Sequence, residues 1–305
     1  MRVSLIDIDS TIPNLALMKI SAYYKAGGAT VGFNIDDPDR AFISVIFKKN
    51  RGIANQSANM LKALYPNVII DIGGPGYDLT KTLPQAIEDT APDYALYPNM
   101  GYALGFTTRG CIRACPFCVV PKKEGKLRRV NSIENIYRPE LPAIKLLDNN
   151  VLADPDNFKH IVDFCADHNV KLDVSQGLDI RLLTSDLAEY IARIKPLHKL
   201  DFAFDSLAYK DAVKRGIDLL KDAGVNVRGN VQFYVYCDKS VTGEYGFNSA
   251  LERCQLLKSW GTNAYVMLDI NADPSREMKN LKRWANRKAI YWTVDFSAYH
   301  YGAVA

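Results

Sequence analysis

Short apolar segments alternate with helical patterns along the first hundred residues of the chain. Runs rich in β-branched and aromatic residues predict short strands, and the amphipathic segments between them predict helices. The expected strands are Arg2–Ile8, Thr30–Phe33, Phe42–Phe47, Val68–Ile72 and Tyr94–Tyr97, and the expected helices are Pro13–Ala26 and Gln56–Leu64. Such alternation is typical of parallel α/β units, so we expect residues 1–104 to form a Rossmann-like open sheet.

A more regular rhythm begins near residue 103. Apolar strand candidates start at positions 28 residues apart, near Ala143, Lys171, Lys199 and Val227. Two more strands are expected at Ala103–Thr107 and Ala264–Leu268, with amphipathic helical stripes between the strands. A complete eight-unit barrel usually needs ~250 residues. The pattern therefore predicts a partial (β/α)6 barrel of the TIM type in residues 105–305, including a C-terminal extension.

The composition is that of an ordinary globular protein. Of 305 residues, 48% are hydrophobic and 24% are charged, and the net charge of +4 is too small to imply a nucleic-acid partner by itself. No stretch approaches the ~18 consecutive apolar residues of a membrane span. Acidic residues near the N-terminus argue against a secretory signal. We therefore expect a cytoplasmic protein without a membrane partner.

Three of the six cysteines, Cys111, Cys115 and Cys118, lie within eight residues, directly after the first expected barrel strand. A loop this short can wrap its thiolates around one metal centre, and soft thiolates select zinc or an iron–sulfur cluster. A structural zinc site needs four protein ligands. No fourth cysteine lies nearby, and the nearest histidine is His160. The spacing favours a reactive cluster, and structural zinc or unrelated thiols are the alternatives.

The C-x3-C-x2-C spacing, with the aromatic Phe117 just before the last cysteine, resembles the signature of the radical S-adenosylmethionine superfamily. The resemblance implies a [4Fe–4S] cluster held by Cys111, Cys115 and Cys118, whose fourth iron chelates S-adenosylmethionine. It also implies a partial (β/α)6 barrel and an adenine contact at Phe117. A low-potential cluster can deliver one electron to the sulfonium and release a 5′-deoxyadenosyl radical. A reductant protein of the flavodoxin or ferredoxin type is then an expected partner.

The resemblance also suggests further contacts for S-adenosylmethionine. Where the family often has Gly-Gly-Glu, this chain has Leu147-Asp148-Asn149-Asn150, similar to a variant in branches with a cobalamin-type N-terminal domain. Asp148 and Asn149 are therefore candidates for binding the methionine amino group. At the end of the fourth strand, Asp205 and Ser206 resemble a polar pair that contacts the ribose or carboxylate. For all four residues the alternative is a purely structural capping role.

Polar residues at two other strands are weaker candidates. Gln176, Asp179 and Arg181 follow the third barrel strand, and the sites of such barrels assemble at the carboxyl ends of strands. Arg228, Tyr234 and Tyr236 are even-numbered residues of the fifth expected strand and would share one face. These residues are expected to face the cofactor or the substrate.

The N-terminal domain resembles cobalamin-binding domains only in general shape. Gly73-Gly74-Pro75-Gly76 follows a strand, as the glycine turn of those domains does. Such domains commonly carry a cobalt-ligating histidine, but the histidines here are His160, His168, His198 and His300. Histidine-ligated cobalamin is therefore excluded. We expect a degenerate domain that serves substrate or partner binding, and cobalamin bound without a histidine ligand is the alternative.

Two basic segments raise the question of a nucleic-acid substrate. The first contains Lys122, Lys123, Lys126, Arg128 and Arg129; the second contains Lys279, Lys282, Arg283, Arg287 and Lys288, with the aromatic residues Trp284, Tyr291 and Trp292. Basic and aromatic residues together suit phosphate attraction and base stacking. The alternatives are a solvated loop for the first segment and an amphipathic closing helix for the second.

The sequence thus favours a radical S-adenosylmethionine enzyme that abstracts hydrogen from a small-molecule, nucleotide or nucleic-acid substrate. A methyltransferase or methylthiotransferase is the alternative within the enzyme class, although the N-terminal domain lacks a second cysteine triad. The alternative outside the enzyme class is a non-catalytic metal-binding module that binds nucleic acid. Cys165, Cys237 and Cys254 are expected to be ordinary thiols rather than ligands of a second cluster.

Overall fold

The structure, a computed structural model, describes residues 1–269 and 273–299, so His300 lies outside the described residues. The expected α/β class is confirmed, because helices alternate with strands that form parallel sheets. Contacts divide the chain into two units: unit 1 comprises residues 1–101 and 114–125, and unit 2 comprises residues 102–113 and 126–305. The main division lies near the expected boundary at residue 104, but a short segment of the cysteine loop is grouped with unit 1.

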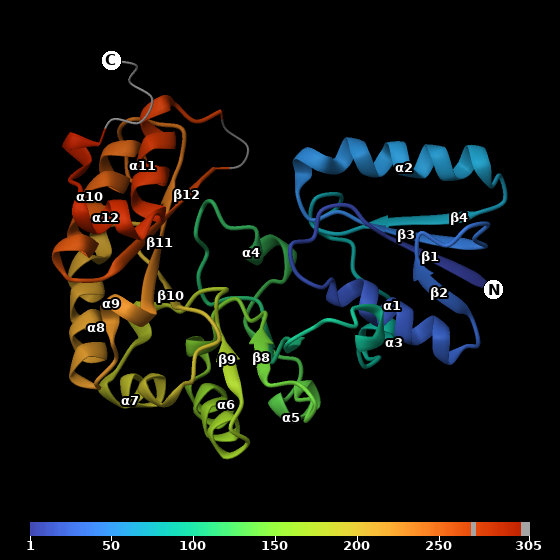
Figure 1. The fold of residues 1–305 in the computed structure, drawn as a ribbon, viewed down its shortest axis with the longest axis horizontal. Coiled ribbons are helices and arrows are strands. Elements are labelled where there is room, and N and C mark those ends of the chain that lie inside the picture. The colour runs from blue at the N-terminus through green and yellow to red at the C-terminus, as the bar shows by residue number, and fades with distance from the viewer. Residues whose placement is uncertain (270–272, 300–305) are drawn as a thin grey trace. The chain divides into compact units, whose positions relative to one another are not determined.

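Unit 1 contains a four-stranded parallel sheet with the order β2-β1-β3-β4. Its strands are β1 (Arg2–Asp7), β2 (Thr30–Phe33), β3 (Arg40–Ser44) and β4 (Ile69–Gly73). Its helices are α1 (Leu15–Ala26), α2 (Arg51–Leu64), α3 (Gln85–Glu88) and α4 (Val120–Lys123). Helix α2 covers one face of the sheet, and α1 and α3 lie on the other (Figure 1).

Alternating side chains of β3 build the two apolar layers of unit 1. Phe42 packs with Leu17 and Ile20 of α1, whereas Ile43 packs with Ala54 of α2. Successive side chains of a strand point to opposite faces, so one short apolar strand serves both layers. The continuous apolar run of β3 is the pattern expected of a parallel strand covered on both sides.

The strand expected at Tyr94–Tyr97 is wrong, because Tyr94–Leu96 forms a 3-10 turn. The Asp93 carboxylate accepts a hydrogen bond of 3.0 Å from the backbone amide of Ala95 and so caps this turn. Aromatic residues favour strands, but here the local cap before them prevails.

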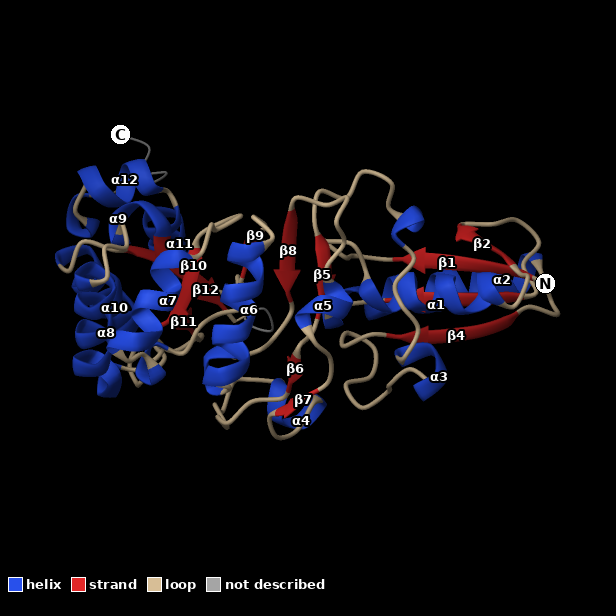
Figure 2. Ribbon diagram, turned by 90° about the horizontal axis from the view of Figure 1, so that it is seen from below, coloured by secondary structure: helices blue, strands red, loops and turns tan. Residues whose placement is uncertain are grey.

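The described residues of unit 2 include six strands that form two parallel sheets, each in chain order. They are β5 (Ala103–Gly105), β8 (Ala143–Leu146), β9 (Lys171–Asp173), β10 (Leu200–Ala203), β11 (Val231–Cys237) and β12 (Asn263–Leu268). The sheets are β5-β8-β9 and β10-β11-β12 (Figure 2). Between them, an isolated parallel bridge joins Leu178 to Phe202. A two-stranded antiparallel pair, β6 (Thr108–Arg109) and β7 (Arg128–Arg129), flanks the cysteine loop.

The described helices of unit 2 lie between its strands and after the last one. They are α5 (Ile133–Ile136), α6 (Pro155–Asp167), α7 (Ser185–Arg193), α8 (Lys210–Asp222), α9 (Val227–Asn230), α10 (Phe247–Ser259), α11 (Arg276–Asn286) and α12 (Lys288–Thr293). On α6 the stripe of Phe158, Ile161, Val162 and Cys165 is buried, as expected from its spacing. Within the described ranges, no helix combines the length and apolarity needed to cross a membrane.

Strand β11 separates the apolar layer of unit 2 from a polar one. Val231, Phe233, Val235 and Cys237 are fully buried, and the residues between them are half-buried on the opposite face. The fifth strand was expected from Val227, but residues 227–230 form α9, because the side chain of Asn226 caps the backbone amide of Gly229. Arg228 therefore does not share a strand face with Tyr234 and Tyr236.

Candidate functional site

The six cysteines fall into two groups that differ in exposure. Cys111, Cys115 and Cys118 are partly exposed, whereas Cys165, Cys237 and Cys254 are buried thiols. Burial raises the pKa of Cys165 and Cys254 to about 12 and that of Cys237 to about 11. Because the thiolate is the metal ligand, these three buried thiols are poorly suited to bind a metal at neutral pH. The three cysteines that the spacing selects are the ones that are partly exposed.

The cysteine loop begins at a rigid anchor. The carboxylate of Asp148, just after β8, accepts hydrogen bonds from the backbone amide and hydroxyl of Thr107, both 3.0 Å long, and from the hydroxyl of Thr108, 2.6 Å long. It also accepts the backbone amide of Thr108. Burial raises the pKa of Asp148, and these four hydrogen bonds oppose that shift. Asp148 thus links the segment after β5 to the end of β8, and both of its carboxylate oxygens accept hydrogen bonds.

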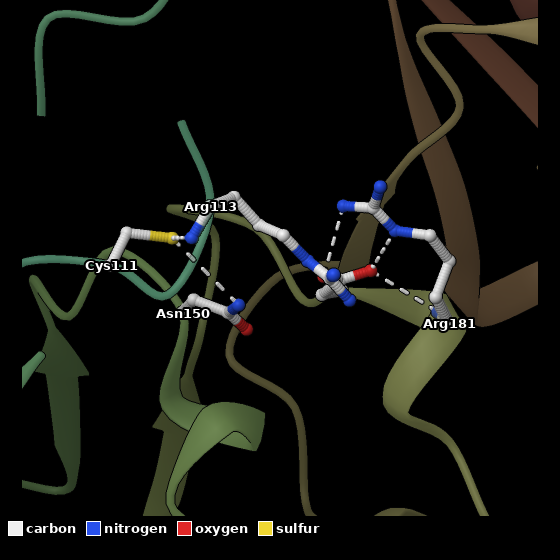
Figure 3. Close-up of polar contacts among 5 residues, drawn as sticks. Cys111, Arg113, Asn150 and Arg181 are labelled. Carbon is white, nitrogen blue, oxygen red and sulfur yellow. Dashed lines mark hydrogen bonds and ion pairs between the residues drawn. The ribbon is translucent and has the colours of Figure 1, made fainter. Parts of the chain in front are cut away.

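The neighbouring Asn150, which the sequence analysis did not single out, lies beside the first cysteine. Its Nδ2 is 4.0 Å from the sulfur of Cys111, and the backbone amide of Arg113 donates to the same sulfur over 3.3 Å (Figure 3). Asn150 is only 3% exposed, and its Oδ1 is a buried acceptor without a hydrogen-bond partner. Burying an acceptor without a hydrogen-bond donor costs free energy, and a bound ligand that donates to it removes this cost. Asn149, the expected candidate, is half-buried.

The other two cysteines are held by a tight turn in unit 1. The backbone amide of Cys118 donates to the carbonyl oxygen of Cys115 over 3.0 Å, which closes a turn through Pro116 and Phe117. Cys111 belongs to unit 2. Across residues 1–269 and 273–299, no three cysteine, histidine or acidic side chains are arranged to hold a metal ion. The shared metal centre therefore stays a prediction from the sequence.

Two arginines converge on the carboxylate of Asp179. Arg113 Nε lies 2.8 Å from Asp179 Oδ2, and Arg181 contacts both oxygens through Nε at 2.6 Å and Nη2 at 3.0 Å. Figure 3 shows the side chains of Arg113 and Arg181 extending toward one another, with Arg113 leading away from Cys111. Burial raises the pKa of Asp179, but the hydrogen bonds from both arginines outweigh it and leave that pKa below its ordinary value. Gln176, in the same loop, is exposed.

The polar pair after β10 serves the local structure. Asp205 accepts the backbone amide of Tyr236 over 2.9 Å, and burial raises its pKa despite this bond and the nearby Arg253 guanidinium. The fully buried Arg253 donates to the carbonyl oxygens of Phe204 and Tyr236. The hydroxyl of Ser206 caps a 3-10 turn through the amide of Ala208. The capping alternative therefore describes the contacts that Ser206 makes.

Buried polar side chains link neighbouring strands of unit 2. Lys145 of β8 forms an ion pair of 2.5 Å with Asp173 of β9 and donates to the hydroxyl of Ser175. The hydroxyl of Tyr234 on β11 donates to the carbonyl oxygen of Ser175 over 2.9 Å. Asp201 of β10 is 4% exposed, and burial raises its pKa to about 6. Charged and polar groups are therefore buried between these strands.

Two of the three aromatic residues of the second basic segment are buried. Trp284 of α11 and Tyr291 of α12 donate from their polar atoms to the carbonyl oxygens of Val294 and Cys254. Trp292 is half-buried, and the guanidinium of Arg228 lies over its ring at 4.3 Å. The packing of Trp284 agrees with the alternative of an amphipathic closing helix for α11. In the first segment, Arg129 is neutralised by the carboxylate of Asp154 at 2.5 Å.

The candidate site thus consists of residues at the carboxyl ends of β5, β8, β9 and β10, the edge at which barrel-type sites assemble. Arg113 and Asn150 belong to this edge although sequence reasoning missed them. The available signals were the place of Arg113 inside the cysteine motif and of Asn150 directly after the two named candidates. In comparisons with known proteins, neither a family model nor a curated sequence matches the chain.

Proposed function

We propose that the chain is a radical S-adenosylmethionine enzyme whose cluster is held by Cys111, Cys115 and Cys118. The observation that carries the proposal is the C-x3-C-x2-C loop, which follows the first of six parallel strands and exposes its three thiols. The three remaining cysteines are buried. Selective exposure of the motif is what a metal-binding role requires and what incidental thiols do not need.

The residues around Cys111 fit the chemistry of such a cluster. Three thiolates are soft ligands and leave one iron of a cubane without a protein ligand. When bound, the cluster supplies an electron that cleaves S-adenosylmethionine to methionine and a 5′-deoxyadenosyl radical, which abstracts hydrogen from the substrate. The two N–H groups directed at the Cys111 sulfur are of the kind that tune cluster potentials.

The residues near the cysteine loop have different proposed roles in binding S-adenosylmethionine. Both carboxylate oxygens of Asp148 already accept hydrogen bonds from the cysteine loop. In our proposal Asn150 therefore replaces Asp148 as the acceptor for the methionine amino group. Its unpartnered Oδ1 can accept a hydrogen bond from an ammonium group. Phe117 for adenine, and Asn149, Asp205 and Ser206 for other cofactor contacts, stay proposals from the resemblance. Gln176 and Tyr234 stay proposals from their positions on the strands.

The proposed architecture is a Rossmann-like domain followed by a partial (β/α)6 barrel. The order β2-β1-β3-β4 in unit 1 is that of doubly wound sheets. In unit 2, six strands in two parallel sheets, each in chain order, support a barrel that is not closed. The buried polar groups Lys145, Asp173 and Asp201 on β8, β9 and β10 are of the kind that a site for a polar substrate needs.

The test is anaerobic reconstitution with iron and sulfide, followed by reaction with dithionite and S-adenosylmethionine. We expect a brown protein with about four irons per chain for a cubane cluster, and formation of 5′-deoxyadenosine. Cys115→Ala should lose both iron and product. Cys165→Ala is the matched control because its thiol is buried on α6, and it should retain both.

A colourless, zinc-loaded protein that stays inert after reconstitution would overturn the proposal. Equal iron content in Cys115→Ala and in the unsubstituted chain would overturn the assignment of the ligands. Deuterium transfer from candidate substrates into 5′-deoxyadenosine would then identify the substrate. An Asn150→Ala variant that binds S-adenosylmethionine as tightly as the unsubstituted chain would remove Asn150 from the proposed contacts.

A further inference from the structure

A cluster of three arginines and two carboxylates lies beyond the carboxyl ends of the unit 2 strands. Arg113 and Arg181 share the carboxylate of Asp179. The buried carboxylate of Asp205 lies within electrostatic range of both Arg181 and Arg253.

The two arginines that share Asp179 are partly removed from water. The side chains of Arg113 and Arg181 are 35% and 23% exposed, and that of Asp179 is 8% exposed. Withdrawing a guanidinium from water costs free energy, and a single carboxylate compensates one such group rather than two. Arg113 and Arg181 thus meet at one carboxylate, and two guanidinium groups held side by side can also bind a second anion.

The guanidinium groups are also held in fixed orientations. Arg181 lies over the ring of Tyr209, with 4.3 Å from its central carbon to the ring centroid, and uses Nε and Nη2 on Asp179. Arg113 uses Nε on the same carboxylate. A planar guanidinium that is already oriented loses little conformational freedom when it binds a carboxylate or phosphate group.

We propose that Arg113 and Arg181 form an anion-binding subsite that receives a carboxylate or phosphate group of the substrate. Arg113 is two residues from Cys111, so a substrate anchored there would have its anionic group close to the cysteine motif. Assigning the ligand to a substrate rests on the proposed function. Binding of the anion itself does not, because it needs only the arginines.

The experiment is titration calorimetry of the 305-residue chain with pyrophosphate and with succinate, which represent the two anion chemistries. Arg181→Gln and Arg113→Gln should each weaken binding of at least one probe by about tenfold or more. Arg193→Gln is the matched control, since Arg193 also pairs with a carboxylate, that of Asp163 at 2.7 Å, but lies on α7. It should bind both probes like the unsubstituted chain.

A second variant separates anion binding from structural support. Asp179→Asn removes the shared negative charge and should lower the urea midpoint of unit 2 unfolding. If the arginines form an anion site, pyrophosphate or succinate should raise that midpoint more in Asp179→Asn than in Arg193→Gln, because the anion replaces the lost charge. A purely structural ion pair would give the same anion effect in both variants.

Each outcome bears on one proposal only. Equal probe affinity in all variants, or a loss of S-adenosylmethionine affinity in Arg181→Gln without loss of probe binding, would overturn the substrate subsite. A selective loss of S-adenosylmethionine affinity would assign Arg181 to the carboxylate of the cofactor. The affinity for decarboxylated S-adenosylmethionine should then be the same in Arg181→Gln and in the unsubstituted chain. A chain that binds the probes through these arginines but never forms 5′-deoxyadenosine would keep the anion site and lose the proposed function.

Discussion

The carboxylate of Asp148 holds Thr107 twice, through its backbone amide and its hydroxyl, each at 3.0 Å. Because the same carboxylate also binds Thr108, Asp148→Ala leaves four buried donors without their partner. We expect the free energy of unfolding of unit 2 to fall by about 3 kcal/mol, since each unmet buried donor costs ~1–3 kcal/mol and relaxation recovers part of the sum. Urea unfolding followed by tryptophan fluorescence measures this, because Trp260, Trp284 and Trp292 all belong to unit 2.

Asp167→Ala is the control for this substitution. Asp167 is the exposed last residue of α6, so its removal should change the unfolding free energy by less than about 0.5 kcal/mol. Under the proposed function, Asp148→Ala should also bind less iron on reconstitution, because the cysteine loop loses its anchor. Equal stability of Asp148→Ala and Asp167→Ala would show that the anchor is unimportant.

The buried Asp201 predicts a specific dependence of stability on pH. Burial raises its pKa from 3.8 to about 6 in the folded chain. The folded state then holds the proton more tightly than the unfolded state, so this contribution to stability is complete below pH 4 and is lost as the pH rises through 6. Asp201→Asn should match the unsubstituted chain near pH 4 and exceed it by roughly 3 kcal/mol at pH 7, at ~1.4 kcal/mol for each pKa unit.

Urea unfolding of both proteins at several pH values between 4 and 8 tests this prediction. Asp222→Asn, an exposed position at the end of α8, should show no such pH-dependent difference. A stability difference between Asp201→Asn and the unsubstituted chain that is the same at pH 4 and pH 7 would contradict the burial argument.

The glycine run after β4 is required by close packing of the backbone. Gly74 has a φ of +95°, and a Cβ atom there would lie 2.4 Å from the carbonyl oxygen of Val45. Gly28 has a similar φ of +79° but no atom within 4 Å of the same position. Gly28→Ala should therefore cost ~1–2 kcal/mol for the left-handed conformation alone, and Gly74→Ala should cost clearly more. Hydrogen exchange of the β3 amides measures both, and equal protection in the two variants would contradict this explanation.

The elements of the fold followed well from the sequence where periodicity was strong. Thr30–Phe33 is a strand with the expected bounds, and the stripe from Phe158 to Cys165 is buried on α6. The predictions failed where a local polar cap competes with an apolar run. Asp93 turns the Tyr94 segment into a 3-10 helix, and Asn226 delays the fifth strand of unit 2 to Val231.

The site was harder to predict, because its contacts join residues far apart in the chain. The cysteine spacing is visible in the sequence, and so is the position of Asp148 at the end of a strand. The partnership of Asp148 with Thr107, across 41 residues, is not visible. Nor does the sequence indicate that Arg113 reaches Asp179, 66 residues away, or that Asn150 keeps an unsatisfied acceptor beside Cys111.

The central claim is that three cysteines hold a cluster with one iron open to S-adenosylmethionine. Electron paramagnetic resonance of the reconstituted, dithionite-reduced chain, recorded with and without S-adenosylmethionine, tests it most directly. The claim predicts the signal of a reduced [4Fe–4S] cluster that changes shape when S-adenosylmethionine is added. A spectrum without a cluster signal, or a cluster signal that S-adenosylmethionine leaves unchanged, would contradict it.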